Sequence, residues 1–148
     1  MTDYPPKLQE ILADFDFVTT RSERAELLID LADRFESVPE RIATPPYPED
    51  HRVPFCESEA FVWSEPLADG TLKFHFAVEN PQGLSAKALA AVLDETLSGA
   101  PVAQVADVSP DIVLKLFGKD LSMGKGQGLM GMVSMVQAAA KRHSVGSE

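Results

Sequence analysis

The chain has 148 residues, a net charge of −10 and a pI of about 4.7. Apolar residues make up 45% and charged residues 24%, which is ordinary for one globular domain. This acidity argues against nucleic-acid partners, which are met by a basic surface, and against binding to an anionic membrane. We therefore expect no nucleic-acid or membrane partner, and any protein partner should present some basic surface.

The first residues, "MTDYPPKLQE", show neither the positive nor the apolar region of a signal peptide. No apolar run approaches the ~18 residues that a transmembrane helix needs. The single cysteine excludes an internal disulfide, which suits a reducing compartment. We therefore expect a cytoplasmic protein. The three histidines lie far apart and predict no metal site.

Two helices are predicted at the N-terminus. Apolar residues at helical spacing predict the first over about residues 6–15. The segment from Thr20 to Glu23 fits a capping box, in which a hydroxyl and a carboxylate satisfy free backbone N–H groups. An apolar stripe from Leu27 to Val38 then predicts that the second helix continues to the residue before Pro39.

A proline-rich loop and two strands follow. Five prolines in residues 39–54 predict a stiff, extended loop that leads to Cys56. Strands are expected over about 59–64 and 71–78, with a hairpin turn at "ADG", residues 68–70. Alternation in the second strand predicts one buried face and one wetter face, with His75 solvated on the wetter face.

The C-terminal half is predicted to be helical. Helices are expected over about 85–97, which Gly99 ends, and over 109–117, where Ser109 is the cap and Pro110 takes the first position. The stretch "LSMGKGQGL" predicts a glycine-rich turn before a last helix over about 127–142, and residues 143–148 are expected to fray. Because the strands are grouped together, the order predicts an α+β fold, a single domain with a small antiparallel sheet packed with helices.

Cys56 is the first candidate for chemistry. A free cysteine is often a small buried hydrophobe, and that structural interpretation stays open. However, Cys56 follows a proline in a loop, and loops held by a scaffold often carry function. Positive charge on His51, Arg52 or Lys125 would favour the thiolate, while Glu57 and its neighbour Glu59 would oppose it.

Other chemistries fit less well. The stretch "GKGQG" resembles a phosphate-binding loop, but its spacing departs from the Walker A pattern and no strand leads into it. A cysteine hydrolase needs a base beside the thiol, and neither His51, His75 nor His143 lies in a known Cys-His signature. An iron–sulfur cluster normally takes several thiolates, and this chain has one.

Three blocks of sequence resemble the SufE family, the sulfur-acceptor proteins of iron–sulfur cluster assembly. Residues 56–61, "CESEAF", resemble the family's segment around its active thiol. Residues 84–93, "LSAKALAAVL", resemble its Lys-Gly-Leu helix, and residues 121–133, "LSMGKGQGLMGMV", resemble its Leu-Ser/Thr-Pro-x-Arg-x-Asn/Gln-Gly-Leu motif. Together with the matching helix order, the blocks cover most of the chain.

The chain departs from the family pattern at several positions. Phe55 stands where the family usually has Gly, and Phe61 stands in for a common Trp. Met123 replaces Pro, and Lys125 replaces Arg, which loses the planar, forked donor geometry of a guanidinium. Gln82 stands where an acidic residue is common, and Ala88 replaces Gly. These changes affect partner contacts and leave the thiol unchanged.

The resemblance implies a SufE- and IscU-like fold over residues 1–148, with an active loop at about 39–58. It implies that Cys56 takes persulfide sulfur from a SufS-like cysteine desulfurase and relays it to a SufBCD-like scaffold, speeding the desulfurase. The chain would be an acceptor and activator rather than a stand-alone enzyme. No cofactor of its own is implied, because pyridoxal phosphate resides on the desulfurase.

Supporting roles are expected for four residues around Cys56. Ser58 is expected to hydrogen-bond the sulfur or to cap the turn, and Lys125 to steady the thiolate or contact the desulfurase. His51 and Arg52 are the nearby basic residues. The alternative is a non-catalytic adaptor that regulates a desulfurase or another partner, with Cys56 merely packed.

Overall fold

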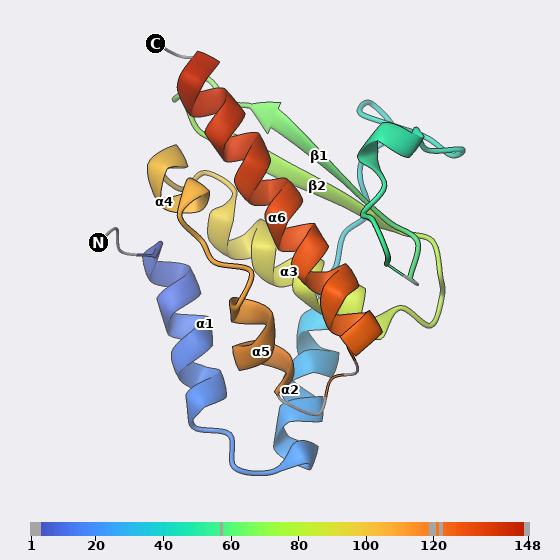
Figure 1. Cartoon of the computed structure of the whole chain (residues 1–148), viewed down its shortest axis with the longest axis vertical. Coiled ribbons are helices and arrows are strands. Elements are labelled where there is room, and N and C mark those ends of the chain that lie inside the picture. Colours follow the sequence, from blue (N-terminus) through green and yellow to red (C-terminus); the bar gives the residue numbers. More distant parts are fainter. Residues whose placement is uncertain (1–3, 57, 119–120, 122, 147–148) are drawn as a thin grey trace.

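The structure is a computed structural model that describes residues 4–56, 58–118, 121 and 123–146 (Figure 1). In chain order its elements are α1 (Pro6–Asp16), α2 (Arg21–Asp33), the short 3-10 helix η1 (Glu49–His51), β1 (Ala60–Pro66), β2 (Leu72–Val78), α3 (Leu84–Leu97), α4 (Val102–Ala106), α5 (Ile112–Phe117) and α6 (Met123–Gly146). The predicted α+β class is confirmed.

The two strands form an antiparallel hairpin. Ala60 pairs with Val78 at one end, and Pro66 pairs with Leu72 at the other. The turn between the strands contains Gly70 with φ of +88°, a left-handed conformation that glycine adopts without strain. The predicted "ADG" turn and both predicted strands are therefore confirmed, with strand boundaries shifted by one or two residues.

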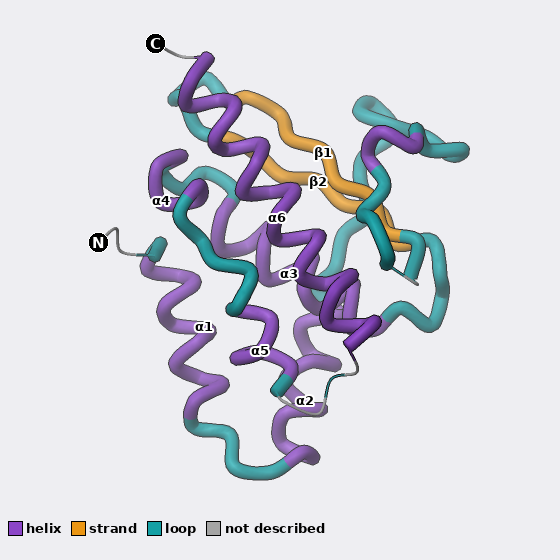
Figure 2. Tube along the Cα trace, in the orientation of Figure 1, coloured by secondary structure: helices purple, strands orange, loops and turns teal. Residues whose placement is uncertain are grey.

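Both faces of this small sheet are covered. One face carries Val62, Phe74 and Phe76 into the main core, where α3 and α6 pack. The other face carries Phe61 and Trp63 against residues of the loop that follows α2. That loop runs beside the sheet, on the side away from α1 (Figure 2).

The prediction that His75 is solvated is wrong. The residue is 7% exposed, and its Nε2 lies 2.9 Å from Oε1 of Glu65. Strand alternation correctly put His75 on the face opposite Phe74. It did not reveal that residues 38–47 would fold back over that face, because this contact joins segments distant in the sequence.

The two N-terminal helices begin where expected. At α2, Oγ1 of Thr20 accepts a hydrogen bond from the backbone N–H of Glu23 at 3.1 Å, so the hydroxyl half of the predicted capping box is confirmed. The carboxylate of Glu23 accepts from the Thr20 hydroxyl at 3.1 Å instead of from a backbone N–H. However, α2 ends at Asp33 rather than before Pro39. Val38 leaves the helical stripe because its backbone N–H donates to the carbonyl of Phe76 at 2.8 Å. The last apolar residue of the stripe thus pairs with β2.

The C-terminal helices differ more from expectation. The short α4 was not predicted, and α5 begins at Ile112, after a turn in which Ser109 Oγ accepts from the backbone N–H of Asp111. The helix α6 begins at Met123, so the predicted glycine-rich turn is wrong over its described residues from 123 onward. The helix α6 runs to Gly146, through residues 143–146 that were expected to fray, and residues 147–148 lie outside the described residues.

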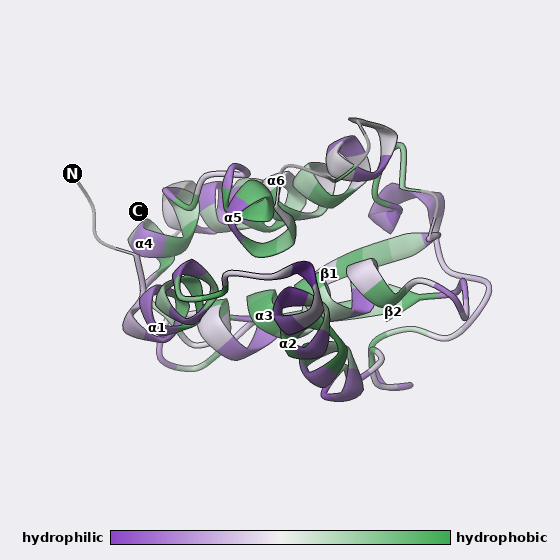
Figure 3. Ribbon diagram, turned by 90° about the horizontal axis from the view of Figure 1, so that it is seen from below, coloured by the Kyte–Doolittle hydropathy of each residue, from purple (hydrophilic) through white to green (hydrophobic). Residues whose placement is uncertain are grey.

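The helices and strands differ in how much of their surface is apolar. Figure 3 shows α5 and the strands carrying mostly apolar residues, whereas α1 and α2 alternate apolar and polar surfaces. The helix α3 is buried along most of its length, from Ala86 to Leu97, and α2, β2 and α1 pack against it. No helix in the described ranges is long and apolar enough to span a bilayer.

Candidate functional site

Cys56 lies at the tip of a narrow loop that is closed by backbone pairing. The N–H of Val53 donates to the carbonyl of Ala60 at 2.8 Å, and Arg52 pairs with Phe61 in an antiparallel bridge. Within the loop, the N–H of Glu59 donates to the carbonyl of Cys56 at 3.2 Å. The pairing that continues β1 thus holds the thiol at a fixed place, and the side chain is half-buried against the main core.

The helix α6 provides the surface on which this loop rests. An ideal Cβ on Gly128 would lie 2.9 Å from Cα of Cys56 and 2.9 Å from the carbonyl oxygen of Phe55. One turn further, a Cβ on Gly131 would lie 3.3 Å from a methyl carbon of Val53. At Gly128 only a residue without a side chain permits this approach, and at Gly131 an added methyl would be tight against Val53, so the two glycines form a seat for the loop.

The backbone on either side of the thiol is strained. Phe55 has φ of +60° and Glu59 has φ of +53°, and both are L-residues in the left-handed region. Such strain costs on the order of 1–3 kcal/mol per residue and tends to cluster at functional sites. Phe55 is also 75% exposed, so burial of its ring does not offset this cost.

An apolar groove lies beside the Cys56 loop. It has a volume of about 640 Å³ and is lined mainly by Pro54, Phe55, Leu114, Leu121 and Met130. The groove therefore runs between the loop, α5 and α6. Leu114 is 46% exposed, so apolar surface is open to solvent in the groove that Phe55, the residue before Cys56, lines.

His51 and Arg52 are both engaged in contacts that fix the loop. Nδ1 of His51 lies 2.8 Å from the carbonyl oxygen of Val62, and the imidazole stacks on Trp63 with centroids 5.2 Å apart. Arg52 forms an ion pair with Glu49 at 3.0 Å. Its guanidinium also lies 4.8 Å from the centroid of the Phe61 ring. The hydrogen bond to Glu49 raises the pKa of Arg52.

Ser58 and Lys125 take different places around the loop. The carbonyl of Ser58 accepts from the N–H of Asn80 at 3.2 Å, and a Cβ on Gly83 would lie 3.0 Å from Cβ of Ser58. Ser58 thus ties the loop to the segment after β2. Lys125 is exposed on the first turn of α6, one turn before Gly128.

Sequence reasoning missed the seat formed by Gly128 and Gly131. A signal was present, because Gly124, Gly128 and Gly131 are spaced four and three residues apart and so lie on one helix face. However, glycines are also typical of turns, and this stretch therefore predicted a turn. The role of Phe55 as a groove-lining residue was also missed, and periodicity gives no signal for it.

A network on the far face of the sheet holds the proline-rich loop. Glu65 on β1 accepts two hydrogen bonds from Arg41, at 2.7 and 3.0 Å, and one contact of 2.9 Å from His75. The hydrogen bonds from Arg41 and His75 lower the pKa of Glu65 from 4.5 to about 2. Because Arg41 belongs to the loop, this network anchors it to β1.

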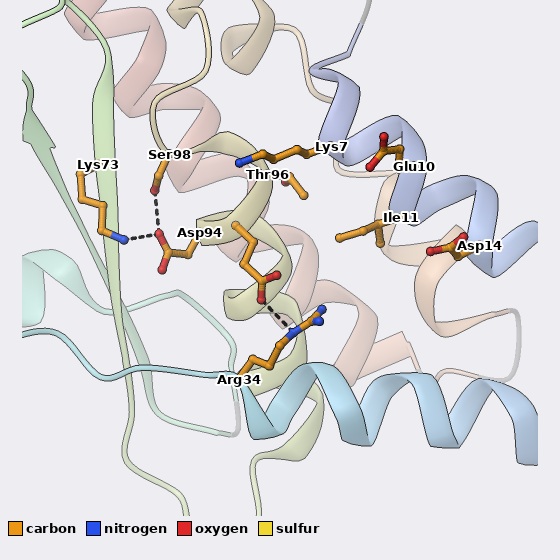
Figure 4. A pocket seen from close by; sticks show the side chains of 10 residues that line it. Lys7, Glu10, Ile11, Asp14, Arg34, Lys73, Asp94, Thr96 and Ser98 are labelled. Carbon is orange, nitrogen blue, oxygen red and sulfur yellow. Dashed lines mark hydrogen bonds and ion pairs between the residues drawn. The ribbon is translucent and has the colours of Figure 1, made fainter.

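A second pocket, of about 690 Å³, is polar and lies between α1, the end of α2, α3 and β2 (Figure 4). In Figure 4, Asp94 points to both Lys73 and Ser98. Arg34 forms an ion pair of 3.1 Å with Glu95, which follows Asp94 in the chain. None of its lining residues belongs to the Cys56 loop. Among the residues that the structure describes, including those of this pocket, no group of three or more His, Cys, Asp or Glu is arranged to hold a metal ion.

Comparison with known proteins adds three findings. The family model described as "SufE: Fe-S metabolism associated domain" matches residues 9–140. The chain is 28% identical over 147 residues to the SufE-like protein 1, chloroplastic/mitochondrial, of Arabidopsis thaliana, covering 99% of this chain and 38% of that relative. The solution structure of a hypothetical protein from Thermus thermophilus has a TM-score of 0.74 and 25% identity, over 97% of this chain and 99% of that one.

Proposed function

The chain belongs to the SufE family and has a role in iron–sulfur metabolism, and on that premise we propose that Cys56 is a sulfur carrier. It accepts persulfide sulfur from a cysteine desulfurase of the SufS-like kind and passes it to an iron–sulfur scaffold of the SufBCD-like kind. The observation that carries the proposal is the position of the chain's only cysteine at the tip of a closed loop, seated on Gly128.

The proposed transfer is a thiol–persulfide exchange. The Cys56 thiolate attacks the outer sulfur of the desulfurase persulfide, and a new S–S bond forms as the S–S bond on the donor breaks. The donor cysteine leaves as a thiolate and takes the bonding electron pair. Cys56 then carries the persulfide with its proton, and the exchange needs no external oxidant or reductant.

A single cysteine suits this chemistry. One sulfur atom is carried, so one thiol is enough. A second thiol nearby would attack the persulfide, form a disulfide with Cys56 and release the carried sulfur. Clearing the donor cysteine frees the desulfurase for another turnover, so the carrier is also an activator. Pyridoxal phosphate belongs to the desulfurase in this scheme, and this chain contributes the thiol and its loop.

The geometry of the loop supports a carrier thiol. A donor cysteine in a recessed active site has to be met by a projecting thiol, and Cys56 lies at the tip of the loop closed by Val53 and Ala60. The strain at Phe55 and Glu59 on either side is typical of a functional loop. The partial burial of Cys56 suits the adaptor alternative as well, so an experiment has to separate the two.

The rate of alanine release by a cysteine desulfurase separates a carrier from an adaptor. With L-cysteine and reductant present, we expect the wild-type chain to raise that rate severalfold and Cys56→Ser to remove the increase. A pull-down with the same desulfurase should show that Cys56→Ser still binds. A full increase in rate with Cys56→Ser would support the adaptor and contradict the carrier.

A further inference from the structure

Phe55 combines two unfavourable features in the isolated chain. Its backbone is in the left-handed region, with φ of +60°, where a bulky L-residue is strained. Its ring is 75% exposed, so it gains little from burial. An Asn or Gly would adopt the same backbone with less strain and expose no apolar ring. A contact made only with a partner would compensate both costs.

The groove beside Phe55 offers an apolar surface on which a partner can make that contact. Phe55 forms one wall, Leu114 on α5 is 46% exposed on another, and Met130 on α6 lines it as well. Exposed aromatic rings surrounded by apolar surface are typical centres of protein interfaces. Methionine side chains adapt to the shape of what binds.

We propose that this groove, with Phe55 at its edge, is a docking site for an apolar surface segment of the cysteine desulfurase that loads Cys56. The inference rests on the proposed function. A stable interface covers roughly 800 Å² on each partner. An interface in which the donor sulfur meets Cys56 therefore also covers the adjacent Phe55 and the groove that it lines.

Cys56 and the residues that line the groove have different roles in this complex. Cys56 performs the exchange, whereas Phe55 and Leu114 set the affinity of the complex and take no part in bond formation. Changes in the groove should therefore raise the desulfurase concentration needed for half-maximal loading of Cys56. At saturating desulfurase the sulfur should still arrive on Cys56, because the thiol is unchanged.

The test titrates a cysteine desulfurase into the chain and measures two quantities for each variant. The first is the dissociation constant by calorimetry without L-cysteine, and the second is the mass of Cys56-bound sulfur formed with L-cysteine. Phe55→Asn removes the ring and suits the left-handed backbone, Phe55→Leu keeps an apolar side chain, and Leu114→Ser alters the opposite wall. Phe17→Asn is the matched control, since Phe17 is 82% exposed at the end of α1 and does not line the groove.

We expect Phe55→Asn and Leu114→Ser each to weaken binding about ten-fold or more, as loss of an interface anchor does, with a smaller change for Phe55→Leu and none for Phe17→Asn. The double variant should weaken binding by less than the product of the two single effects, because both side chains contact one segment. If the wild-type chain is loaded with sulfur but Phe55→Asn or Leu114→Ser binds as tightly as wild type, the docking proposal is wrong. It is equally wrong if these changes dissociate a dimer of this chain or impair only sulfur delivery to the scaffold. If the wild-type chain binds but is never loaded, the proposed function fails instead.

Discussion

Gly128 and Cys56 lie so close together that no side chain fits between them: a Cβ on Gly128 would be 2.9 Å from Cα of Cys56. The atoms that such a Cβ would meet are mainly backbone, so they cannot move aside as the end of a flexible side chain can. The helix and the loop therefore determine each other's position. In a sulfur carrier, this contact would set how far the thiol projects.

Gly128→Ala tests the seat. The added methyl should push the loop off α6, costing about 1–3 kcal/mol through overpacking, partly offset by about 1 kcal/mol of improved helix propensity. We expect a lower free energy of unfolding and severalfold faster alkylation of Cys56 by iodoacetamide, because the displaced loop exposes the half-buried thiol.

Gly124→Ala is the matched control, since a Cβ there meets no atom within 4 Å. We expect it to keep the wild-type alkylation rate and to lose no stability. Equal alkylation rates and equal stability for Gly128→Ala and wild type would show that the loop does not rest on this glycine.

Glu65 should make the fold sensitive to acid. Its pKa is lowered from 4.5 to about 2 by Arg41 and His75, so the ionised carboxylate stabilises the folded state fully above about pH 4.5. That contribution is lost as the pH falls from about 4.5 towards 2. Glu65→Gln should be less stable than wild type at neutral pH and should lose less stability across this pH window. Urea unfolding at several pH values measures how the free energy of unfolding of each variant changes with pH, and Glu10→Gln on α1 is an exposed control. If the free energy of unfolding fell equally with pH for Glu65→Gln and wild type, the assignment to Glu65 would be wrong.

Arg24 should stabilise the end of α5. Its guanidinium donates to the carbonyls of Lys115 at 2.9 Å and Leu116 at 2.7 Å, and it lies 5.8 Å from the centroid of the Phe15 ring. Hydrogen bonds from charged groups contribute about 1.5–3 kcal/mol, so we expect Arg24→Ala to lower the free energy of unfolding by about 2 kcal/mol. Arg34→Ala breaks an exposed pair with Glu95 and should cost at most about 1 kcal/mol. Chemical denaturation of both variants checks the difference, and equal losses would argue against the capping role.

Local sequence patterns predicted much of the fold because helix caps, turns and strand alternation are determined by neighbouring residues. The helix cap at Thr20, the hairpin turn at Gly70 and the alternation in β2 all depend on residues close in the chain. Contacts between distant segments explain the errors at Val38 and His75. Val38 belongs to the helical stripe by spacing, but its N–H pairs with Phe76, and His75 is buried because a distant loop covers it.

The site was predicted in part for the same reason. The sequence singled out Cys56 and its loop, because a lone thiol after a proline-rich stretch is visible without a structure. It did not indicate that Gly128 and Gly131 would lie in a helix, since glycine disfavours helices. Their use becomes clear only from the loop that packs on them. The left-handed conformation of Phe55 was likewise hidden, because no local rule favours it for a phenylalanine.

The most direct test of the central claim is the intact mass of the chain after incubation with a cysteine desulfurase and L-cysteine, without reductant. We predict a gain of one or more sulfur atoms that disappears on reduction and is absent in Cys56→Ser. An unchanged mass, with the Cys56 thiol still free while the desulfurase releases alanine, would contradict sulfur transfer to Cys56 from that desulfurase.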